Sequence, residues 1–368
     1  MKMMTISNLP GDLVDEILSR VPLKYMRAVR LTCKSWNDLS KSQSFTKLHV
    51  GKALAASKEG ESQMIVLIRN NIYLTSIVLN GDPSTEHEAK LTCLGEQVKV
   101  LKSFQCEGLL LCILEDDSSF VVWNPYLGQP TWIEPRYFHG PCSYALGYVN
   151  KESCRSYKLL RFIDDDYCSS QLFWYEIYDF DSDLWTTLHV TRHWRIPFSD
   201  RGVSLKGNTY WCAKERNSDF EEVLFADRLI CFDFTSERFG PLMPMPMPFN
   251  AAYDDDVSLS CVREEKLAVL LQHNTVNPYE FDLWITTKIE TGQMLWCKFL
   301  RLKMDSNIAC INGNFYLDEE KRVAISFDDV NCHKVNIIGE DGYFRALDLV
   351  AELKADILRE ICGLMFQV

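Results

Sequence analysis

The chain has 368 residues, of which 47% are apolar and 12% aromatic, so it can bury a large core and is not an intrinsically disordered chain. Its formal net charge of −12 argues against general nucleic-acid binding, because phosphate binding needs a basic surface. Residues 1–50 carry eight Lys or Arg and four Asp or Glu, a net of +4, which leaves −16 for the other 318 residues. We therefore expect two modules with different partners.

The cysteines predict a reduced, intracellular protein. The 14 cysteines include no C-x-x-C pair and occur singly, as in the apolar run Leu111-Cys112-Ile113. This usage is typical of the cores of cytosolic and nuclear proteins. The N-terminus shows no apolar segment of signal-peptide length, and no apolar stretch reaches the roughly 18 residues of a membrane span. We expect a protein of the nucleus or cytoplasm that is not secreted, binds no membrane and needs no cofactor.

Residues 9–22 predict an amphipathic helix between two prolines. Asp12 is placed to cap it, and Pro22 stops it. The apolar residues that share one face are Leu13, Val14, Ile17, Leu18 and Val21. A second helical pattern follows, with Met26, Val29, Cys33 and Trp36 on one face. A module of about fifty residues is marginal alone, so these faces either pack on the large downstream domain or dock on a partner.

The order of residues in this segment resembles the F-box motif in its plant form. The matching runs are Leu9-Pro10, residues 12–22, residues 30–37 and Phe45. The resemblance implies a three-helix module that binds the Skp-type adaptor of a cullin-based ubiquitin ligase. The residues that it implies for adaptor binding are Leu9, Pro10, Leu13, Ile17, Leu18, Val21, Pro22, Leu31, Cys33 and Trp36. One departure is Tyr25-Met26, where many members have Ser-Leu, a change that removes a helix cap.

The region after residue 63 predicts an all-β repeat domain. We expect an F-box domain at 1–50, a polar linker at 51–63 and the repeat domain at 64–368. Its unit is an apolar strand, a polar turn and an aromatic strand. The equivalent points Trp123, Tyr178, Phe232, Ile285 and Ile337 are 55, 54, 53 and 52 residues apart. With an earlier copy from Ile72, this spacing predicts a β-propeller of about six blades, five or seven being the alternatives.

Two further patterns bear on the repeat. Residues 205–212 and 310–318 each place a Gly-Asn turn before an aromatic pair, which supports about four strands in each unit. The apolar tail at 363–368 is suited to closing the ring. The segment at 353–362 has a helical pattern that a propeller closure does not need.

Residues 64–350 resemble the F-box-associated domain of plant F-box proteins, a kelch-like propeller. The resemblance is carried by "VWNPYLGQ" at 122–129, "YDFDSDLW" at 178–185 and "FDFTSERF" at 232–239. The chain has no Gly-Gly dipeptide, so it departs from a strict kelch pattern. The resemblance implies a domain that receives the protein to be ubiquitinated.

Together these features predict the substrate-recognition subunit of an SCF-type (Skp–cullin–F-box) ubiquitin ligase. The F-box would bind the adaptor, and the propeller would bind a client protein and promote its ubiquitination and degradation without catalysis. We expect client contacts at loop tips, with Trp194 the most exposed aromatic candidate. The candidate client-binding residues are His193, Trp194, Asp165, Tyr167, Tyr253 and Asp255. The acidic triplets at 164–166 and 254–256 are expected to be solvated and to attract a client with a basic surface.

Two alternatives remain open. The first is a propeller enzyme that uses the N-terminal helices as a packing element. His189 and His193 have the spacing of a helical zinc site, but that motif's Glu is missing and the segment favours a strand. No nucleophile motif is present, and no cysteine has a base beside it in the sequence. We therefore expect neither a metal site nor a catalytic residue.

The second alternative is a glycan-binding, lectin-like F-box protein, because tryptophans can stack on sugar rings. The tryptophans considered for such stacking are Trp174, Trp185, Trp194, Trp211, Trp284 and Trp296. Most tryptophans beside the repeat units are expected in the blade core instead. These are Trp123, Trp185, Trp284 and Trp296.

Overall fold

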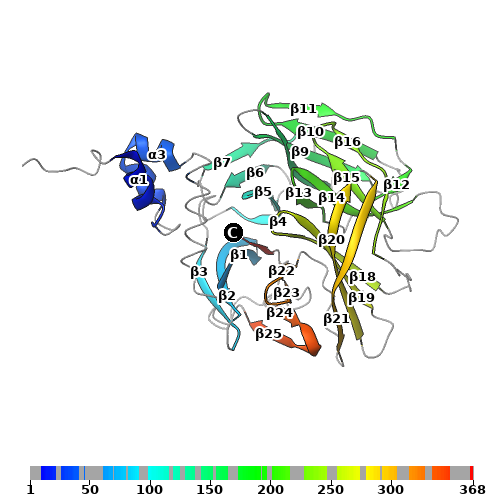
Figure 1. Ribbon diagram of the computed structural model, residues 1–368. Coiled ribbons are helices and arrows are strands. Elements are labelled where there is room, and N and C mark those ends of the chain that lie inside the picture. Colours follow the sequence, from blue (N-terminus) through cyan, green and yellow to red (C-terminus); the bar gives the residue numbers. More distant parts are fainter. Residues whose placement is uncertain are drawn as a thin grey trace, which may run out of the picture.

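Three short helices and a ring of antiparallel sheets form the described part of the chain (Figure 1). The computed structural model describes residues 10–21, 26–40, 45, 61–68, 70–79, 82–90, 98–115, 119–124, 129–136, 142–151, 155–164, 173–191, 193–196, 201–215, 228–246, 255–273, 279–290, 292–304, 315–327, 334–348 and 365–367. The helices are α1 (Gly11–Leu18), α2 (Met26–Thr32) and α3 (Lys34–Ser40). They lie to one side of the sheets in Figure 1. The predicted helical segment at 353–362 falls outside the described residues.

Helix α1 starts and ends differently from the prediction. Pro10 is its N-cap residue and no side chain caps it, so the predicted Asp12 cap is wrong. Asp12 lies in the first turn, where its charge suits the positive end of the helix dipole. The helix ends at Leu18, and beyond it the N–H groups of Arg20 and Val21 donate to carbonyl oxygens only three residues back. The α-helical hydrogen-bond pattern therefore ends before Pro22 is reached.

The first three sheets are blades 1 to 3 of a propeller, each a four-stranded antiparallel meander. Blade 1 holds β26 (Met365–Gln367), β1 (Glu61–Ile68), β2 (Asn71–Val78) and β3 (Ser84–Lys90). Blade 2 holds β4 (Val100–Cys106), β5 (Leu109–Leu114), β6 (Phe120–Asn124) and β7 (Gln129–Ile133). Blade 3 holds β8 (Ser143–Asn150), β9 (Arg155–Asp164), β10 (Phe173–Asp179) and β11 (Leu184–Thr187).

The other three sheets complete the ring. Blade 4 holds β12 (Trp194–Arg195), β13 (Val203–Leu205), β14 (Asn208–Glu215), β15 (Arg228–Asp233), β16 (Arg238–Phe239) and β17 (Met243–Pro244). Blade 5 holds β18 (Asp255–Val262), β19 (Lys266–His273), β20 (Tyr279–Glu290) and β21 (Gln293–Met304). Blade 6 holds β22 (Tyr316–Asp318), β23 (Val323–Phe327), β24 (Lys334–Gly339), the 3-10 turn η3 (Glu340–Gly342) and β25 (Phe344–Asp348). The described strands thus confirm the prediction of a six-bladed propeller.

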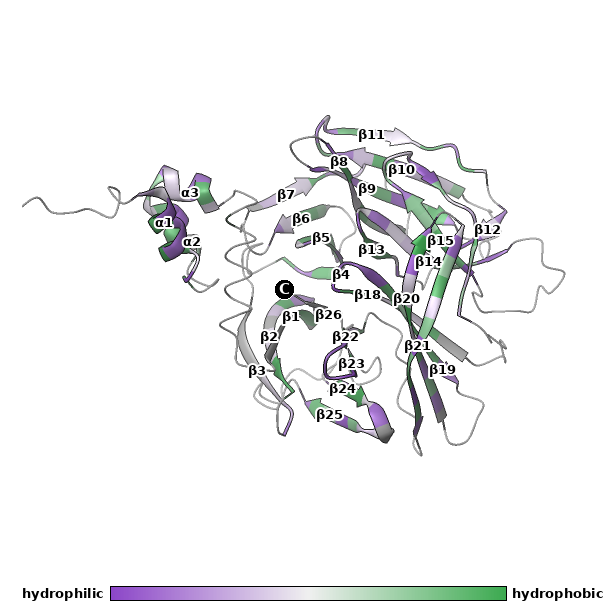
Figure 2. Ribbon diagram, viewed as in Figure 1, coloured by the Kyte–Doolittle hydropathy of each residue, from purple (hydrophilic) through white to green (hydrophobic). Residues whose placement is uncertain are grey.

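The core of the propeller lies between neighbouring blades. Each of six apolar clusters joins one blade to the next around the ring. Figure 2 shows hydrophobic residues, in green, running through the strands of every blade. The ring closes where β26 pairs antiparallel with β1 through three residue pairs, Met64 with Gln367 being the first. The prediction that the apolar tail closes the ring is confirmed.

The five predicted repeat points all lie on the third strand of a blade and are all buried. Their side chains do not face the same way. Trp123 packs toward the preceding blade, blade 1, whereas Ile337 packs toward the following one, which is again blade 1. Alternate strand residues face opposite sides, so a one-residue shift explains the difference. The residues of blades 5 and 6 that face the preceding blade as Trp123 does are Thr286 and Ile338. The predicted points Ile285 and Ile337 are each one residue early.

The meander gives the propeller two different ends. Turns between the first and second and between the third and fourth strands lie at one end, here called the hairpin end. Connections between the second and third strands and between blades lie at the other, the loop end. Several hairpin-end turns are tight: Gly207, at φ +84°, approaches Tyr148 so closely that a Cβ would lie 2.7 Å from the Tyr148 carbonyl oxygen. That turn therefore requires glycine.

Strand β1 begins at Glu61, inside the segment predicted as a linker, and the rest of that segment, 51–60, lies outside the described residues. The β1–β2 turn is at the loop end, because the Asn70 carbonyl oxygen accepts a hydrogen bond of 2.9 Å from Val100, which starts β4. Strand β1 therefore starts at the hairpin end. The chain that leaves the helices enters the propeller at the end opposite the long loops.

Candidate functional site

The three helices build a small core from their own residues. Leu18, Met26 and Phe45 are its buried centre. The partly buried residues packed against it are Val14, Val21, Val29, Trp36 and Leu39. Every member of this cluster comes from residues 14–45, and the propeller contributes none. The interpretation of the helices as a packing element of the large domain therefore finds no support in this core.

Three large apolar side chains of the module are left in solvent. Leu13 and Ile17, one helical turn apart on α1, are 49% and 47% exposed, and Leu31 on α2 is 80% exposed. Full burial of each would contribute about 1.5–3 kcal/mol. Figure 2 shows hydrophobic and hydrophilic residues side by side on the helices. An apolar surface of this kind, left uncovered on a folded module, is typical of a partner interface.

The structure divides the predicted adaptor-binding set. Pro10, Leu13, Ile17 and Leu31 are exposed, and Val21, Cys33 and Trp36 are partly exposed. Leu18 is 2% exposed and belongs to the module core, so it cannot share an outer face with Leu13. The five apolar residues predicted to share one face therefore divide, with Leu13 and Ile17 exposed to solvent and Leu18 buried in the module core. Leu9 and Pro22 lie outside the described residues.

Polar contacts fix the ends of these helices. The Arg20 guanidinium donates to a Glu16 carboxylate oxygen at 2.6 Å, and Arg30 Nε donates to Ser40 Oγ at 3.1 Å, which ties α2 to α3. Cys33, between these two helices, has its Sγ 3.2 Å from Ser35 Oγ. Hydrogen bonding with the Ser35 hydroxyl and with the Trp36 backbone lowers the pKa of the Cys33 thiol. The Arg30–Ser40 hydrogen bond therefore ties together the two helices on either side of Cys33.

The described strand ends beside the predicted client-binding residues are at the loop end. Asp165 and Tyr167 follow β9, the second strand of blade 3. His193 directly precedes β12 of blade 4, and Tyr253 precedes β18 of blade 5. The candidates of blades 3, 4 and 5 are therefore all attached to strand ends at the same end of the propeller.

The predicted client-binding residues differ in their exposure. His193 is exposed. Trp194 is 1% exposed and packs with its ring centroid 4.4 Å from that of Phe239, so the prediction that it is the most exposed candidate is wrong. It starts a two-residue strand that pairs with β14 and fills the cluster between blades 3 and 4. Asp165, Tyr167 and Tyr253 lie outside the described residues.

The acidic triplets are less solvated than expected. Asp164 is buried, and its Oδ2 accepts a hydrogen bond of 3.1 Å from the Ile196 N–H. Asp255 and Asp256 are not a loop tip but the first residues of β18, where they pair with His273 and Gln272. The side chains of these two aspartates lie outside the described residues. Because Asp164 is buried, the triplet at 164–166 is not fully exposed to solvent.

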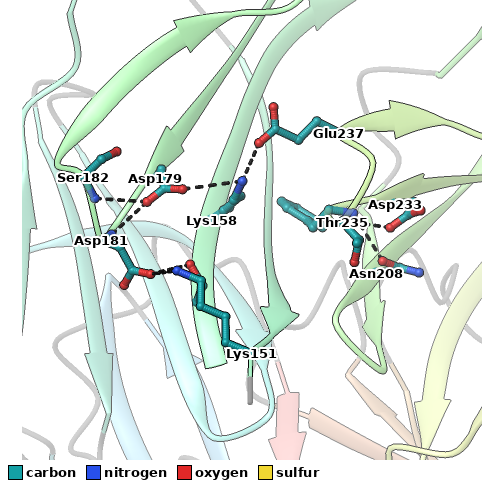
Figure 3. Close-up of polar contacts among 11 residues, drawn as sticks. Lys151, Lys158, Asp179, Asp181, Ser182, Asn208, Asp233, Thr235 and Glu237 are labelled. Carbon is teal, nitrogen blue, oxygen red and sulfur yellow. Dashed lines mark hydrogen bonds and ion pairs between the residues drawn. The ribbon is translucent and has the colours of Figure 1, made fainter. Parts of the chain in front are cut away.

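The hairpin end is closed by ion pairs that run from blade to blade. Lys158 of blade 3 lies between Asp179 of its own blade, at 3.5 Å, and Glu237 of blade 4 (Figure 3). Among the described residues, further blade-to-blade pairs at this end are Arg155 with Glu107, Arg263 with Glu319 and Glu320, Lys266 with Glu319 and Arg345 with Asp82. Each of these pairs joins opposite charges on neighbouring blades. The hairpin end is therefore suited to holding the ring together.

The motifs "YDFDSDLW" and "FDFTSERF" are two of these hairpin-end turns. Asp179 accepts hydrogen bonds from the N–H groups of Asp181, at 2.9 Å, and Ser182, at 3.1 Å. Asp233 accepts one from Thr235 at 2.8 Å (Figure 3). Burial acts to raise the pKa of Asp179, but these backbone bonds and Lys158 outweigh it and lower the pKa. The shared Asp is therefore explained by turn formation.

Burial keeps the thiols of four described propeller cysteines protonated. Burial raises the pKa of Cys112 to about 12, and Cys106, Cys231 and Cys261 behave alike, so these thiols are protonated near neutral pH. Within the described residues, no group of three or more His, Cys, Asp or Glu could hold a metal ion. His189 lies beyond the end of β11, outside any strand. No helix of the described ranges is long and apolar enough to cross a membrane.

Two features were not predicted from the sequence. Trp132 on the outer strand β7 is 50% exposed, whereas Trp123 and Trp211, which belong to similar aromatic runs, are fully buried. Arg161 and Glu176 form a buried ion pair at 3.4 Å inside blade 3. Burial raises the pKa of Glu176 to about 7, although the Arg161 charge opposes this rise. The alternation of side chains along β9 and β10 could have shown from the sequence that Arg161 and Glu176 both face the core.

Comparison with known proteins places both modules in one family. Residues 6–48 match the family model described as F-box domain, and residues 63–363 match the one described as F-box associated beta propeller domain. The chain is a plant-type F-box protein with an F-box-associated propeller. It is 55% identical over 356 residues to the F-box/kelch-repeat protein At4g33290 of Arabidopsis thaliana, covering 92% of this chain and 81% of that protein.

A second relative supports the assignment. The F-box protein At2g38590 of Arabidopsis thaliana is 50% identical over 381 residues, covering 97% of this chain and 89% of that protein. Similarity to solved structures is lower. The structure titled "Structure of YjhT" has a TM-score of 0.41 and 10% identity, over 66% of this chain and 81% of that one. The family assignment therefore depends on the sequence matches.

Proposed function

We propose that this protein is the client-recognition subunit of an SCF-type ubiquitin ligase. The observation that carries the proposal is a folded F-box module whose exposed residues Leu13, Ile17 and Leu31 are not used by its own core or by the propeller. This surface would bind a Skp-type adaptor and, through it, a cullin scaffold. Opposite charge would assist the encounter, because residues 1–50 carry a net charge of +4 and adaptors of this kind are acidic.

The propeller would hold the client at its loop end. The chain enters the propeller at the opposite, hairpin end, where the turns are tight and the charges are paired. A client at the loop end would therefore not compete with the adaptor for space. The net charge of −16 outside the first fifty residues favours a client with a basic surface.

The protein would contribute no catalytic group. Its role would be to raise the effective concentration of the client near a charged ubiquitin carrier. The four propeller thiols with a pKa of about 12 are poor candidates for carrying ubiquitin as a thioester. The nucleus and the cytoplasm are the compartments in which such a complex would act.

The test is binding of a purified Skp-type adaptor to the full chain, measured by calorimetry. The double variant Leu13→Asp/Ile17→Asp should lower the affinity at least about 100-fold, because binding would bury unpaired carboxylates. Both side chains are about half exposed, so the module should stay folded. The matched control is Leu184→Asp/Leu295→Asp, two exposed leucines of the propeller that should not matter. Equal loss in both variants, or no loss in the first, would contradict the proposal.

A further inference from the structure

Five uncharged polar side chains face one another between blades 5 and 6, and each is at most 6% exposed. They are Ser258 and Ser260 on β18, Gln272 on β19, Ser326 on β23 and Asn336 on β24. Their orientation follows from strand alternation. The residues two positions away, which pack in the apolar cluster between these blades, are Val262, Leu270, Ala324 and Ile338. A polar layer, here called the 5/6 layer, therefore lies inside an otherwise apolar interface.

The 5/6 layer differs from the equivalent level of blades 4 and 5 and from that of blade 3, where Arg161 and Glu176 form a buried ion pair. Ser326 on β23 is paired with Asn336 on β24. Asn336 is two residues from Ile338, so both side chains lie on the side of blade 6 that faces blade 5. At the same level, blade 4 has Trp211 paired with an isoleucine, and blade 5 has Trp284 paired with a valine. Blade 6 thus has two small polar side chains where both preceding blades have a tryptophan and an aliphatic residue.

Ser326 and Asn336 also lack hydrogen-bond partners at buried atoms. Ser326 Oγ and Asn336 Nδ2 have none among the described residues, although the two residues are 0% and 2% exposed. An unsatisfied buried polar group costs about 1–3 kcal/mol, so each one requires an explanation such as strain, a functional role or a bound partner. Both groups can donate. A molecule that satisfies them must therefore present an acceptor oxygen.

The surroundings favour an uncharged guest. None of the five side chains of the 5/6 layer is charged, so a buried charge would have no compensating partner. The rim toward the loop end carries Lys334 directly opposite Asp348 in the β24–β25 register, one charge of each sign. We propose that the 5/6 layer is a binding site for an uncharged group that carries an acceptor oxygen, such as a primary amide or a hydroxyl group. The source is a free small molecule or, resting on the proposed function, a client side chain.

The test uses the double variant Ser326→Val/Asn336→Val, which gives blade 6 an apolar pair at the level where blades 4 and 5 also carry apolar side chains, and should therefore fold. The matched control is Thr209→Val, which removes another buried hydroxyl without a partner, in blade 4. The probe is acetamide, added to the full chain. The side-chain amide NMR signal of Asn336, identified by its loss in the double variant, should shift saturably with acetamide. Thr209→Val should leave that shift unchanged.

A second arm separates the two sources. Proximity labelling in cells should lose clients in the double variant, but not in Thr209→Val, if a client supplies the group. A saturable acetamide shift with unchanged clients would assign the site to a free small molecule. If neither arm responds and the double variant only raises the melting temperature, the layer is structural and the proposal is wrong. Adaptor binding is measured in parallel, because its loss would count against the proposed function and not against this site.

Discussion

At the scale of single residues, exposure separates the roles of the apolar residues on α1. Leu13 and Ile17 are half exposed, whereas Leu18, on the same short helix, is buried in the module core. Helical spacing puts Leu13 and Ile17 on one flank of α1 and Leu18 on another, but spacing alone does not show which flank is internal. Burial against Met26 and Phe45, which come from later in the chain, decides which leucine is internal.

The buried pair Arg161 and Glu176 gives a prediction at the same scale. The pKa of Glu176 is raised to about 7 in the folded protein, above its ordinary value of 4.5. Between these values the folded state binds more protons than the unfolded state, so the free energy of unfolding should fall as pH rises from 4.5 to 7. The fall should be at most about 3 kcal/mol. Urea unfolding of the full chain at several pH values measures it.

Glu176→Gln removes this titration. The variant should show a flatter dependence of stability on pH over the same range, while Glu290→Gln, at an exposed position, should keep the wild-type profile. A profile for Glu176→Gln that matches wild type would show that the pKa of Glu176 is not raised. If the free energy of unfolding rose with pH in the wild type but not in Glu176→Gln, the Arg161 charge would outweigh burial and lower the pKa of Glu176.

At the scale of elements, the sequence predicted the strands better than their orientation. The spacing of Trp123, Tyr178, Phe232, Ile285 and Ile337 placed one point on the third strand of each blade from 2 to 6. The last two points are one residue early, and this offset arises between Phe232 and Ile285, because both register shifts of the β20–β21 pair skip residues that come after Ile285. A period near 53 cannot show a shift of one residue, yet that shift reverses the face.

The second repeat pattern, which equated residues 205–212 with residues 310–318, was also wrong. Tyr210 lies in β14, the second strand of blade 4, whereas Phe315 precedes β22, the first strand of blade 6. Gly-Asn before aromatic residues occurs at both places because turns followed by strands are common in this fold. The two segments are therefore not equivalent, although the four-strand unit that they were used to support is present.

The blade-to-blade ion pairs give a prediction at the element scale. Lys158 is mostly buried and contacts both Asp179 and Glu237, so Lys158→Met should lower the free energy of unfolding by about 1–3 kcal/mol. Lys288→Met is the control, because Lys288 and Glu290 are exposed and belong to one strand. That change should cost less than about 0.5 kcal/mol. Equal effects in urea unfolding would show that the hairpin-end pairs do not fasten the blades.

At the scale of the whole molecule, the division of charge follows the division of the chain into an F-box module and a propeller. The sequence predicted the two modules and the number of blades from residue order and period. It could not predict which strand ends lie at the same end of the propeller, because that depends on the strand order in each blade. The prediction for Trp194 was also wrong, because this residue has charged neighbours in the sequence but is buried between blades 3 and 4.

The two modules should therefore be separable in function. The most direct measurement is proximity labelling by the full chain in plant cells under proteasome inhibition, comparing wild type with Leu13→Asp/Ile17→Asp. We predict that the variant loses the Skp-type adaptor and the cullin from its labelled set but keeps the same clients, and that these clients become more abundant in cells that contain only the variant. Retention of the adaptor by the variant, or loss of the clients together with the adaptor, would contradict the account.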